Sequence, residues 1–243
     1  MSQPDPSQPG PALPRAAVSW SGGKDACLAL HTVRGAFSLV SAVTMMDETG
    51  DRNRSHGLRA DVLRAQVEAL GLAWVTRPCT WDSYEDQFID ALRETARDGV
   101  THLVCGDLLY PEHRAWVERV CAAAGLTAVE PLFGTPTGEV LASCLDAGIV
   151  ARIIAVDSTK LGPEWLFREL SLDAAGAFDR LGVDPCGEHG EYHTVVTHCP
   201  AFAAPVPLVA GEQVQRRGYW AIDAQLAPLP ASAQGAGVSP PIR

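Results

Sequence analysis

A glycine-rich turn near the N-terminus is the first candidate for chemistry. Ser21-Gly22-Gly23-Lys24-Asp25 lies between an expected strand at 16–20 and an expected helix at about 24–34. Paired glycines let the backbone approach an anion closely, and a helix N-terminus presents unpaired N–H groups and the positive end of its dipole. Lys24 adds a charge for phosphate oxygens, and Asp25 a carboxylate for magnesium. The turn predicts a phosphate site, with an ordinary strand-to-helix turn as the alternative.

This turn differs from the common nucleotide-binding loops. Val18 stands where a Walker A loop has its first glycine, and Ala26 is neither serine nor threonine. The string is not G-x-G-x-x-G either. Lysine occurs elsewhere only at Lys160, so Lys24 is unusual in this chain and favours a specific role.

A second group of residues follows the fourth expected strand, at 102–105. Gly106-Asp107 stands at its carboxyl end, where open α/β sheets bind ligands. His113 and Arg114 follow on the next expected helix. The alternative is that Asp107 caps this helix and that Arg114 is a solvated helix residue.

The third group, Asp184 to Thr194, is dense in polar side chains. It contains Cys186 and then Gly187-Glu188-His189-Gly190-Glu191-Tyr192-His193-Thr194. Carboxylates, imidazoles and a phenol between two glycines suit a binding loop for a polar substrate. The spacing is poor for zinc, and a polar surface loop before an edge strand is the alternative.

Strands and helices alternate between these groups, which predicts an α/β fold with a doubly wound, mostly parallel sheet. Expected strands lie at 16–20, 37–46, 73–76, 102–105, 126–129 and 149–156, and expected helices at 24–34, 57–70, 84–92, 112–124 and 139–146. The alternation ends near Ser158. A smaller α+β region follows, with a helix at 172–181 and β-like pieces at 192–197 and 213–222.

This pattern predicts four parts of the chain. Residues 1–14 are expected to form a disordered leader, 15–157 a nucleotide-binding domain, 158–225 a C-terminal substrate region and 226–243 a disordered tail.

Composition narrows the function classes. The chain has 243 residues, a net charge of −10 and 47% hydrophobic residues. The acidic charge disfavours duplex nucleic acid as a partner, and no apolar run is long enough to span a membrane. The seven cysteines include no C-x-x-C pair, and the N-terminus is not typical of a signal peptide. We expect a cytoplasmic protein with free thiols.

Taken together, the motifs resemble the diphthine–ammonia ligase family of PP-loop ATP pyrophosphatases. That family has an SGGKDS loop, a His-Gly pair, a Gly-Asp with a downstream His-Arg-x-Trp-x-Glu, and a Gly-Glu-x-Gly-Glu-Tyr/Phe-His-Thr segment. The matching residues span the expected core, and Ala26 departs from the pattern. They are Ser21 to Asp25, His56-Gly57, Gly106-Asp107, His113-Arg114-x-Trp116-x-Glu118 and Gly187 to Thr194.

The resemblance implies a HUP-type, Rossmann-like sheet and an ATP-dependent ligase that forms an amide. A carboxylate is adenylated, AMP and pyrophosphate are released, and ammonia or an amine attacks. The implied residues fall into three sets. Those for ATP are Ser21, Gly22, Gly23, Lys24, Asp25, His56, Gly106 and Asp107, with magnesium at Asp25. Those for substrate are His113, Arg114, Gly187, Glu188, Gly190, Glu191, Tyr192, His193 and Thr194. Those with catalytic roles are Lys24, Asp25, Asp107, Glu188, Glu191 and His193.

Several alternatives stay open. The acceptor is either diphthine on elongation factor two or, in a bacterial paralogue, a different carboxylate, and it is either a small molecule or protein-borne. A tRNA thiolase or lysidine-type ligase is disfavoured by the acidic charge and the missing C-x-x-C pair. A nucleotide-binding sensor without turnover does not need the segment 187–194. A homodimer is also left open.

Overall fold

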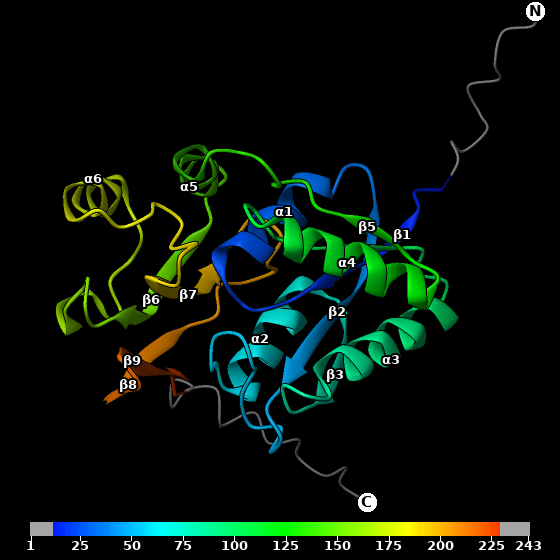
Figure 1. Cartoon of the computed structure of the whole chain (residues 1–243), viewed down its shortest axis with the longest axis horizontal. Coiled ribbons are helices and arrows are strands. Elements are labelled where there is room, and N and C mark those ends of the chain that lie inside the picture. Colours follow the sequence, from blue (N-terminus) through cyan, green and yellow to red (C-terminus); the bar gives the residue numbers. More distant parts are fainter. Residues whose placement is uncertain (1–11, 229–243) are drawn as a thin grey trace, which may run out of the picture.

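Five parallel strands form the first sheet of the computed structural model, which describes residues 12–228. The sheet order is β3-β2-β1-β4-β5, so the strand order reverses beside β1 (Figure 1). A crevice at the carboxyl ends of the strands follows from such a reversal. The strands are β1 (Arg15–Ser19), β2 (Ser38–Met46), β3 (Ala73–Pro78), β4 (His102–Val104) and β5 (Thr127–Val129).

Helices cover both faces of this sheet, which confirms the doubly wound arrangement. One apolar core lies under α3 and α4, and it includes Phe88, Leu92 and Val120. The opposite face packs against α1 and α2 in a larger core that continues into the second sheet. The four helices are α1 (Lys24–Val33), α2 (Ala60–Leu70), α3 (Tyr84–Arg97) and α4 (Pro111–Ala124).

The second sheet is antiparallel, with the order β7-β6-β9-β8. It lies with α5 and α6 to the left of the first sheet in Figure 1. Its elements are α5 (Thr137–Asp146), β6 (Val150–Asp157), the 3₁₀ turn η1 (Pro163–Trp165), α6 (Leu172–Leu181), β7 (Tyr192–His198), β8 (Leu208–Arg216) and β9 (Tyr219–Leu226).

Strand β7 joins the second sheet to the glycine turn of the first. The backbone N–H of Val196 donates to the Gly22 carbonyl at 2.9 Å. The buried Gln66 side chain of α2 donates from Nε2 to both the Gly22 and Val196 carbonyls, at 3.1 and 2.7 Å. Its Oε1 accepts from Trp20 Nε1 at 3.1 Å. The turn and β7 therefore form one hydrogen-bonded unit.

Two predictions about the later strands are wrong: the pairing of one strand, and the number of strands in another segment. The strand expected at 149–156 does not extend the parallel sheet: as β6 it pairs antiparallel with β7 and β9. The single piece expected at 213–222 is instead part of a hairpin of two strands. Its turn has Arg217 at φ 50° and Gly218 at φ 86°, and positive φ at both central positions matches the twist of paired strands.

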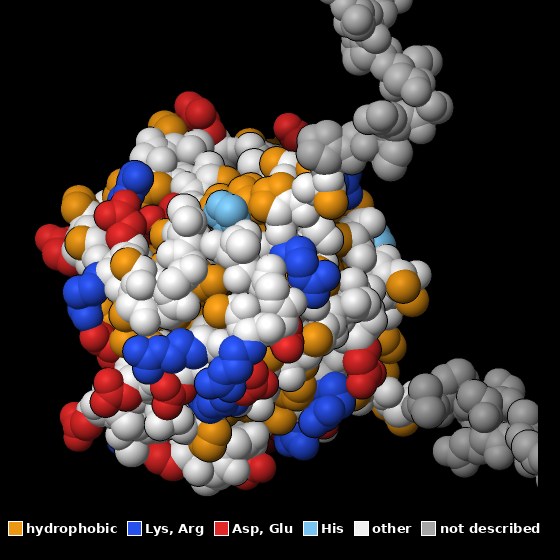
Figure 2. Space-filling view, turned by 90° about the vertical axis from the view of Figure 1, so that its right-hand side faces the viewer, with side chains coloured by type: hydrophobic (Ala, Val, Ile, Leu, Met, Phe, Trp, Pro, Cys, Tyr) orange, Lys and Arg blue, Asp and Glu red, His pale blue; other side chains and the backbone are white. Residues whose placement is uncertain are grey.

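The expected leader at 1–14 and tail at 226–243 fall mainly outside the described residues, of which 12–14 precede β1 and 226 ends β9. Within residues 12–228, no helix has the length and apolar character needed to cross a membrane. On the face shown in Figure 2, basic (Lys or Arg) and acidic side chains lie interspersed in the lower half.

Gly22 offers a test of how tightly the turn is packed. Its φ is +81°, and an added Cβ would lie 2.7 Å from Leu58 Cδ1. Gly71 has a φ of +68° with no atom within 4 Å of an added Cβ, so it is a matched control for the backbone strain alone. We predict that Gly71→Ala lowers the free energy of unfolding by about 1 kcal/mol, and Gly22→Ala by about 2 kcal/mol more.

Urea unfolding of both variants measures this difference. Equal losses in the two variants would show that the turn has room to relax, and would contradict the close packing.

Candidate active site

The turn between β1 and α1 gives the site its backbone. An added Cβ at Gly23 would lie 2.4 Å from His56 Cε1, so only glycine allows this imidazole to lie against the turn. Gly106, at the end of β4, also lies close to the first turn of α1: an added Cβ would lie 2.7 Å from Ala26 N. The glycines thus let β4, α1 and His56 converge at one point.

Lys24 is buried, and it joins the turn to the late polar segment. Its Nζ donates to the Cys186 carbonyl at 2.5 Å and to Asp25 Oδ2 at 2.9 Å, and it lies 5.2 Å from the Tyr192 ring centroid. Burial opposes the charge, but Asp25 and the other neighbours outweigh it, so the pKa of Lys24 is well above its ordinary value. Lys24 is a buried cation that fixes the loop at Cys186.

The late segment is also bound to the start of α1. Thr194 Oγ1 accepts from the Lys24 backbone N–H at 3.1 Å, and so satisfies one of the free donors at the helix N-terminus. The Thr194 carbonyl lies 3.1 Å from His56 Nδ1. Because a carbonyl only accepts, Nδ1 carries the proton, and in the neutral ring Nε2 keeps its lone pair.

A buried glutamate holds the shape of this segment. Glu191 Oε1 accepts from Lys160 Nζ at 3.0 Å and from the Asp184 backbone N–H at 3.3 Å. Its Oε2 accepts from the His189 N–H at 3.0 Å. The carboxylate is 1% exposed and lines neither cavity described below. These contacts support a structural part for Glu191 in place of the expected catalytic one.

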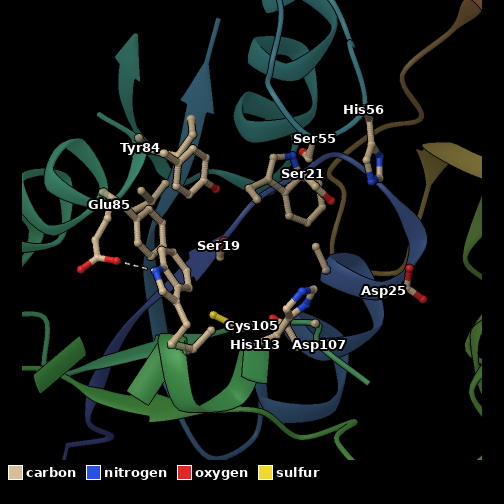
Figure 3. Close-up of a pocket in the computed structure, with 18 of the residues that line it drawn as sticks. Ser19, Ser21, Asp25, Ser55, His56, Tyr84, Glu85, Cys105, Asp107 and His113 are labelled. Carbon is tan, nitrogen blue, oxygen red and sulfur yellow. Dashed lines mark hydrogen bonds and ion pairs between the residues drawn. The ribbon is translucent and has the colours of Figure 1, made fainter. Parts of the chain in front are cut away.

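A cavity of about 640 Å³ opens at the carboxyl ends of the parallel strands. Ser21, Asp25 and His56 line one side, and Tyr84 and Glu85 lie on the opposite side (Figure 3). Its floor and remaining walls include Ser19, Trp20, Val43, Met45, Phe88, Gly106, Asp107, His113 and Trp116. An apolar, aromatic half and a polar half therefore share one space.

A smaller, polar cavity of about 220 Å³ adjoins the first. Both are lined by Asp25, His56 and Glu188, so these side chains form the wall between them. The smaller cavity is completed by residues of the turn and of the late segment, namely Lys24, Cys186, Gly187, Gly190, Tyr192, His193 and Thr194.

Burial shifts the pKa values of the ionisable groups in and beside the shared wall. Burial and the neighbouring Asp25 raise the pKa of Glu188 to about 7. Burial is the main cause that lowers the pKa of His56 to about 3, and the charge of the neighbouring His193 is the second cause. Burial also lowers the pKa of His193. Both imidazoles are therefore neutral at pH 7, while Glu188 exchanges a proton near that pH.

The carboxylates can be tested for fit to magnesium. Asp25 Oδ1 is buried without a hydrogen-bond partner in the described chain, whereas Oδ2 is bound by Lys24. Burial raises the pKa of Asp107, which lies on the same cavity. Residues 12–228 contain no cluster of three candidate metal ligands, but magnesium is usually held by one or two carboxylates together with phosphates. Asp25 fits that arrangement.

Most of the predicted site residues come together here. The residues that line the two cavities are Ser21, Lys24, Asp25, His56, Gly106, Asp107, His113 and most of Gly187–Thr194, whereas Gly22 and Gly23 line neither. Arg114 does not: its Nε lies 3.0 Å from Glu118 and 3.7 Å from Glu130, and it stacks on Phe133. Cys186 is buried, and burial raises the pKa of its thiol, so a reactive thiolate is disfavoured.

Two important groups were missed in the sequence. Gln66 is a polar residue inside the apolar stripe of α2, and that irregularity is the signal that could have revealed it. Tyr84, Phe88 and Trp116 form the second group, a stack of rings from α3 and α4 that lines the large cavity.

Comparisons with known proteins agree with this arrangement. Residues 14–128 match the model of the diphthamide synthase N-terminal domain, and residues 137–226 match that of the C-terminal domain. The chain belongs to the diphthamide synthase family. This confirms the family that the motifs resemble. The first match covers the parallel sheet up to Ala128, and the second covers the whole antiparallel sheet.

Curated relatives of the diphthamide synthase chain carry the name diphthine–ammonia ligase. The zebrafish (Danio rerio) protein is 27% identical over 224 residues, covering 80% of this chain and 86% of its own. The human protein is 25% identical, with 82% and 85% covered. The Schizosaccharomyces pombe protein is 26% identical, with 80% and 36% covered. These names agree with the predicted class, an ATP-dependent carbon–nitrogen ligase.

A solved structure, described as a predicted subunit of tRNA methyltransferase from Methanocaldococcus jannaschii, aligns with a TM-score of 0.41 at 13% identity. The alignment covers 77% of this chain and 98% of that one.

Glu188 predicts a dependence of stability on pH. Its pKa is raised in the folded protein, so the folded state holds this proton more firmly than the unfolded state. Stability from this group is present below the ordinary pKa and is lost as the pH rises through about 7. We expect Glu188→Gln to stabilise the protein at pH 8 by at most about 3 kcal/mol and to leave stability at pH 4 unchanged.

Unfolding at the two pH values measures this effect, with Glu68→Gln, at an exposed position of α2, as the control. A gain for Glu188→Gln that is equal at pH 4 and pH 8 would contradict the raised pKa.

The buried contacts of Glu191 predict that removing its carboxylate destabilises the protein. Glu191→Ala removes the acceptor for Lys160 and for two backbone N–H groups, and leaving such groups buried and unpaired costs about 3 kcal/mol. Glu169 pairs with Arg152 at 3.5 Å and is exposed, so Glu169→Ala should cost less than about 1 kcal/mol. Thermal unfolding of both variants compares the two, and similar losses would count against the structural part assigned to Glu191.

Proposed function

We propose that this protein is an ATP-dependent amide ligase that adenylates a carboxylate and transfers it to ammonia or an amine. The observation that carries the proposal is the pair of adjoining cavities, which share Asp25, His56 and Glu188. One cavity is large enough for a nucleotide, and the other suits a small nucleophile. The wall between them consists of three ionisable side chains.

ATP is assigned to the larger cavity. The start of α1 directs the positive end of the helix dipole toward phosphate oxygens, together with those N–H groups that Ser21 and Thr194 leave unpaired. Ser21, Gly22, Gly23 and Lys24 are assigned to the phosphates, with the buried Lys24 cation acting from the adjoining smaller cavity, which it lines. Gly106 and Asp107, at the end of β4 beside the first turn of α1, are assigned to the same nucleotide. Magnesium, held by Asp25 and by the phosphates, would neutralise charge on the phosphate oxygens.

The amine is assigned to the smaller cavity. Two neutral imidazoles supply acceptors for N–H groups, and the Glu188 carboxylate is suited to take a proton near pH 7. His193 is assigned to orient the nitrogen, with Tyr192 and Thr194 as fixed parts of the wall. A volume of about 220 Å³ is ample for ammonia or a small amine.

The chemistry follows from these positions. A carboxylate oxygen of the acceptor attacks the α-phosphorus of ATP, the bond to the β-phosphate oxygen breaks, and pyrophosphate leaves. The nitrogen then attacks the acyl carbon, the acyl–oxygen bond breaks, and AMP leaves. Glu188 takes the proton lost by the nitrogen. In this chemistry the chain acts mainly by positioning and by neutralising charge.

The name of the relatives makes diphthine the first acceptor to test. A different carboxylate, as in a bacterial paralogue, is the alternative acceptor. A nucleotide sensor without turnover is the alternative function, and it does not need a second cavity beside the nucleotide.

The decisive experiment follows the products of ATP. The protein is incubated with ATP, magnesium, an ammonium salt and a diphthine-bearing protein, and the products are resolved by ³¹P NMR. We expect AMP and pyrophosphate with wild type and with Glu68→Gln. With Glu188→Gln we expect a rate at least tenfold lower at pH 8 and an unchanged affinity for ATP. Binding of ATP without AMP in wild type, with diphthine and with other carboxylates, would indicate a sensor.

A further inference from the structure

Strand β9 supplies an aromatic side chain next to the smaller cavity. The Tyr219 ring lies nearly parallel to the His193 ring, with centroids 6.3 Å apart and an interplanar angle of 22°. His193 in turn lies beside His56, with ring centroids 4.9 Å apart. Tyr219 itself lines neither cavity of the proposed active site. The three neighbouring rings therefore connect β9 to the wall between the two cavities.

The pairing of the second sheet explains how Tyr219 reaches His193 across the middle strand, β6. Ala155 of β6 pairs with His193 on one side and with Ala221 on the other. Paired residues share a face of a sheet, and so do residues two apart in one strand. Tyr219 therefore lies on the same face as His193. The two alanines between them have small side chains, which leave space for the tyrosine ring.

The hydroxyl of Tyr219 holds a loop that lines the smaller cavity. It donates to the Gly190 carbonyl at 3.0 Å, and Gly190 is part of the cavity lining. Gly190 has a φ of +81°, and an added Cβ would lie 3.0 Å from the same Tyr219 Oη. Glycine at this position therefore lets the late segment lie close against β9.

Strand β9 is also bound to the segment that carries His56. Asp223, four residues after Tyr219 and so on the same face, accepts from Arg52 Nη2 at 2.8 Å. Arg52 Nη1 donates to the carbonyl of Gly57, next to His56, at 2.8 Å. Because β9 contacts the loops on both sides of the imidazole pair, Tyr219 is fixed relative to His56 as well as to His193.

Four ionisable side chains face His193. They are His56 from the 52–59 segment, Lys24 and Asp25 from α1, and Tyr219 from β9. Burial is the main cause that lowers the pKa of His193, the Lys24 charge adds to it, and Asp25 opposes it. The Tyr219 ring covers part of the imidazole, so its removal would let water reach His193 and would favour the charged form.

We infer that Tyr219 is a positioning residue: its ring orients His193, its hydroxyl holds Gly190, and the smaller cavity thereby keeps the shape that the amine needs. This role rests on the proposed function, which assigns the amine to that cavity. A small misplacement of the groups that bind a nucleophile lowers the rate strongly. The effect of Tyr219 should fall on the amine and spare ATP, which is assigned to the larger cavity.

NMR titration of the histidine rings tests the placement of His193 without turnover. His193→Gln assigns the signal, and its pKa is followed in wild type, Tyr219→Ala and Trp220→Ala. Trp220 is next along β9 and therefore on the opposite face, where it is partly buried against the core, so it is the matched control for lost packing. We expect the pKa of His193 to rise by about 1 in Tyr219→Ala and to keep its wild-type value in Trp220→Ala.

Steady-state release of AMP tests the effect on the reaction. In Tyr219→Ala we expect the KM for ammonium to rise about tenfold or more and the KM for ATP to stay unchanged. Trp220→Ala should keep both wild-type values. Tyr219→Phe keeps the ring and loses the bond to Gly190, so we expect its KM for ammonium to rise about threefold with an unchanged pKa of His193. This conservative variant keeps the test valid if Tyr219→Ala does not fold.

Three results would overturn the positioning role while leaving the ligase in place. They are an unchanged pKa of His193 in Tyr219→Ala, an equal rise of the KM for ammonium in Tyr219→Ala and Trp220→Ala, and an unchanged KM for ammonium in Tyr219→Phe. Absence of AMP release by wild type, together with the expected change in the pKa of His193, would instead count against the ligase and leave the placement of His193 by Tyr219 intact.

Discussion

The site depends on the contact between β7 and the glycine turn. The Val196 N–H and the Gln66 side chain both bind the Gly22 carbonyl, while Thr194 Oγ1 accepts from the backbone N–H of Lys24. The bonds of Val196 and Thr194 join residues that lie more than a hundred positions apart in the chain. Because the turn and the late segment are fixed to one another, the second sheet completes a crevice that the first sheet leaves open at its carboxyl edge.

The electrostatics of the site follow from this assembly. Closing the late segment over α1 buries the wall between the two cavities, and burial is the main cause of the pKa shifts there. The same closure brings the Lys24 cation beside Asp25 and against the Cys186 carbonyl. A proton acceptor that works near pH 7 and two neutral imidazoles therefore arise from the packing of residues that are individually ordinary.

The sequence was sufficient for the parallel sheet and for the convergence of its three motif regions. The glycine turn and Gly106 could be predicted because backbone conformation and close approach demand glycine there. The place of β6 could not, since a short apolar strand has the same pattern in a parallel and in an antiparallel sheet. The structural role of Glu191 could not be predicted from the sequence either, because the tertiary fold determines its partners Lys160 and Asp184.

Hydrogen exchange of two backbone amides tests the central contact most directly. In the native protein the amides of Lys24 and Val196 both donate across the junction, to Thr194 Oγ1 and to the Gly22 carbonyl. We expect both to exchange slowly in wild type, and both to exchange at least tenfold faster in Gln66→Ala under conditions where the protein stays folded. Fast exchange of either amide in wild type, or a variant in which the two respond independently, would contradict the account.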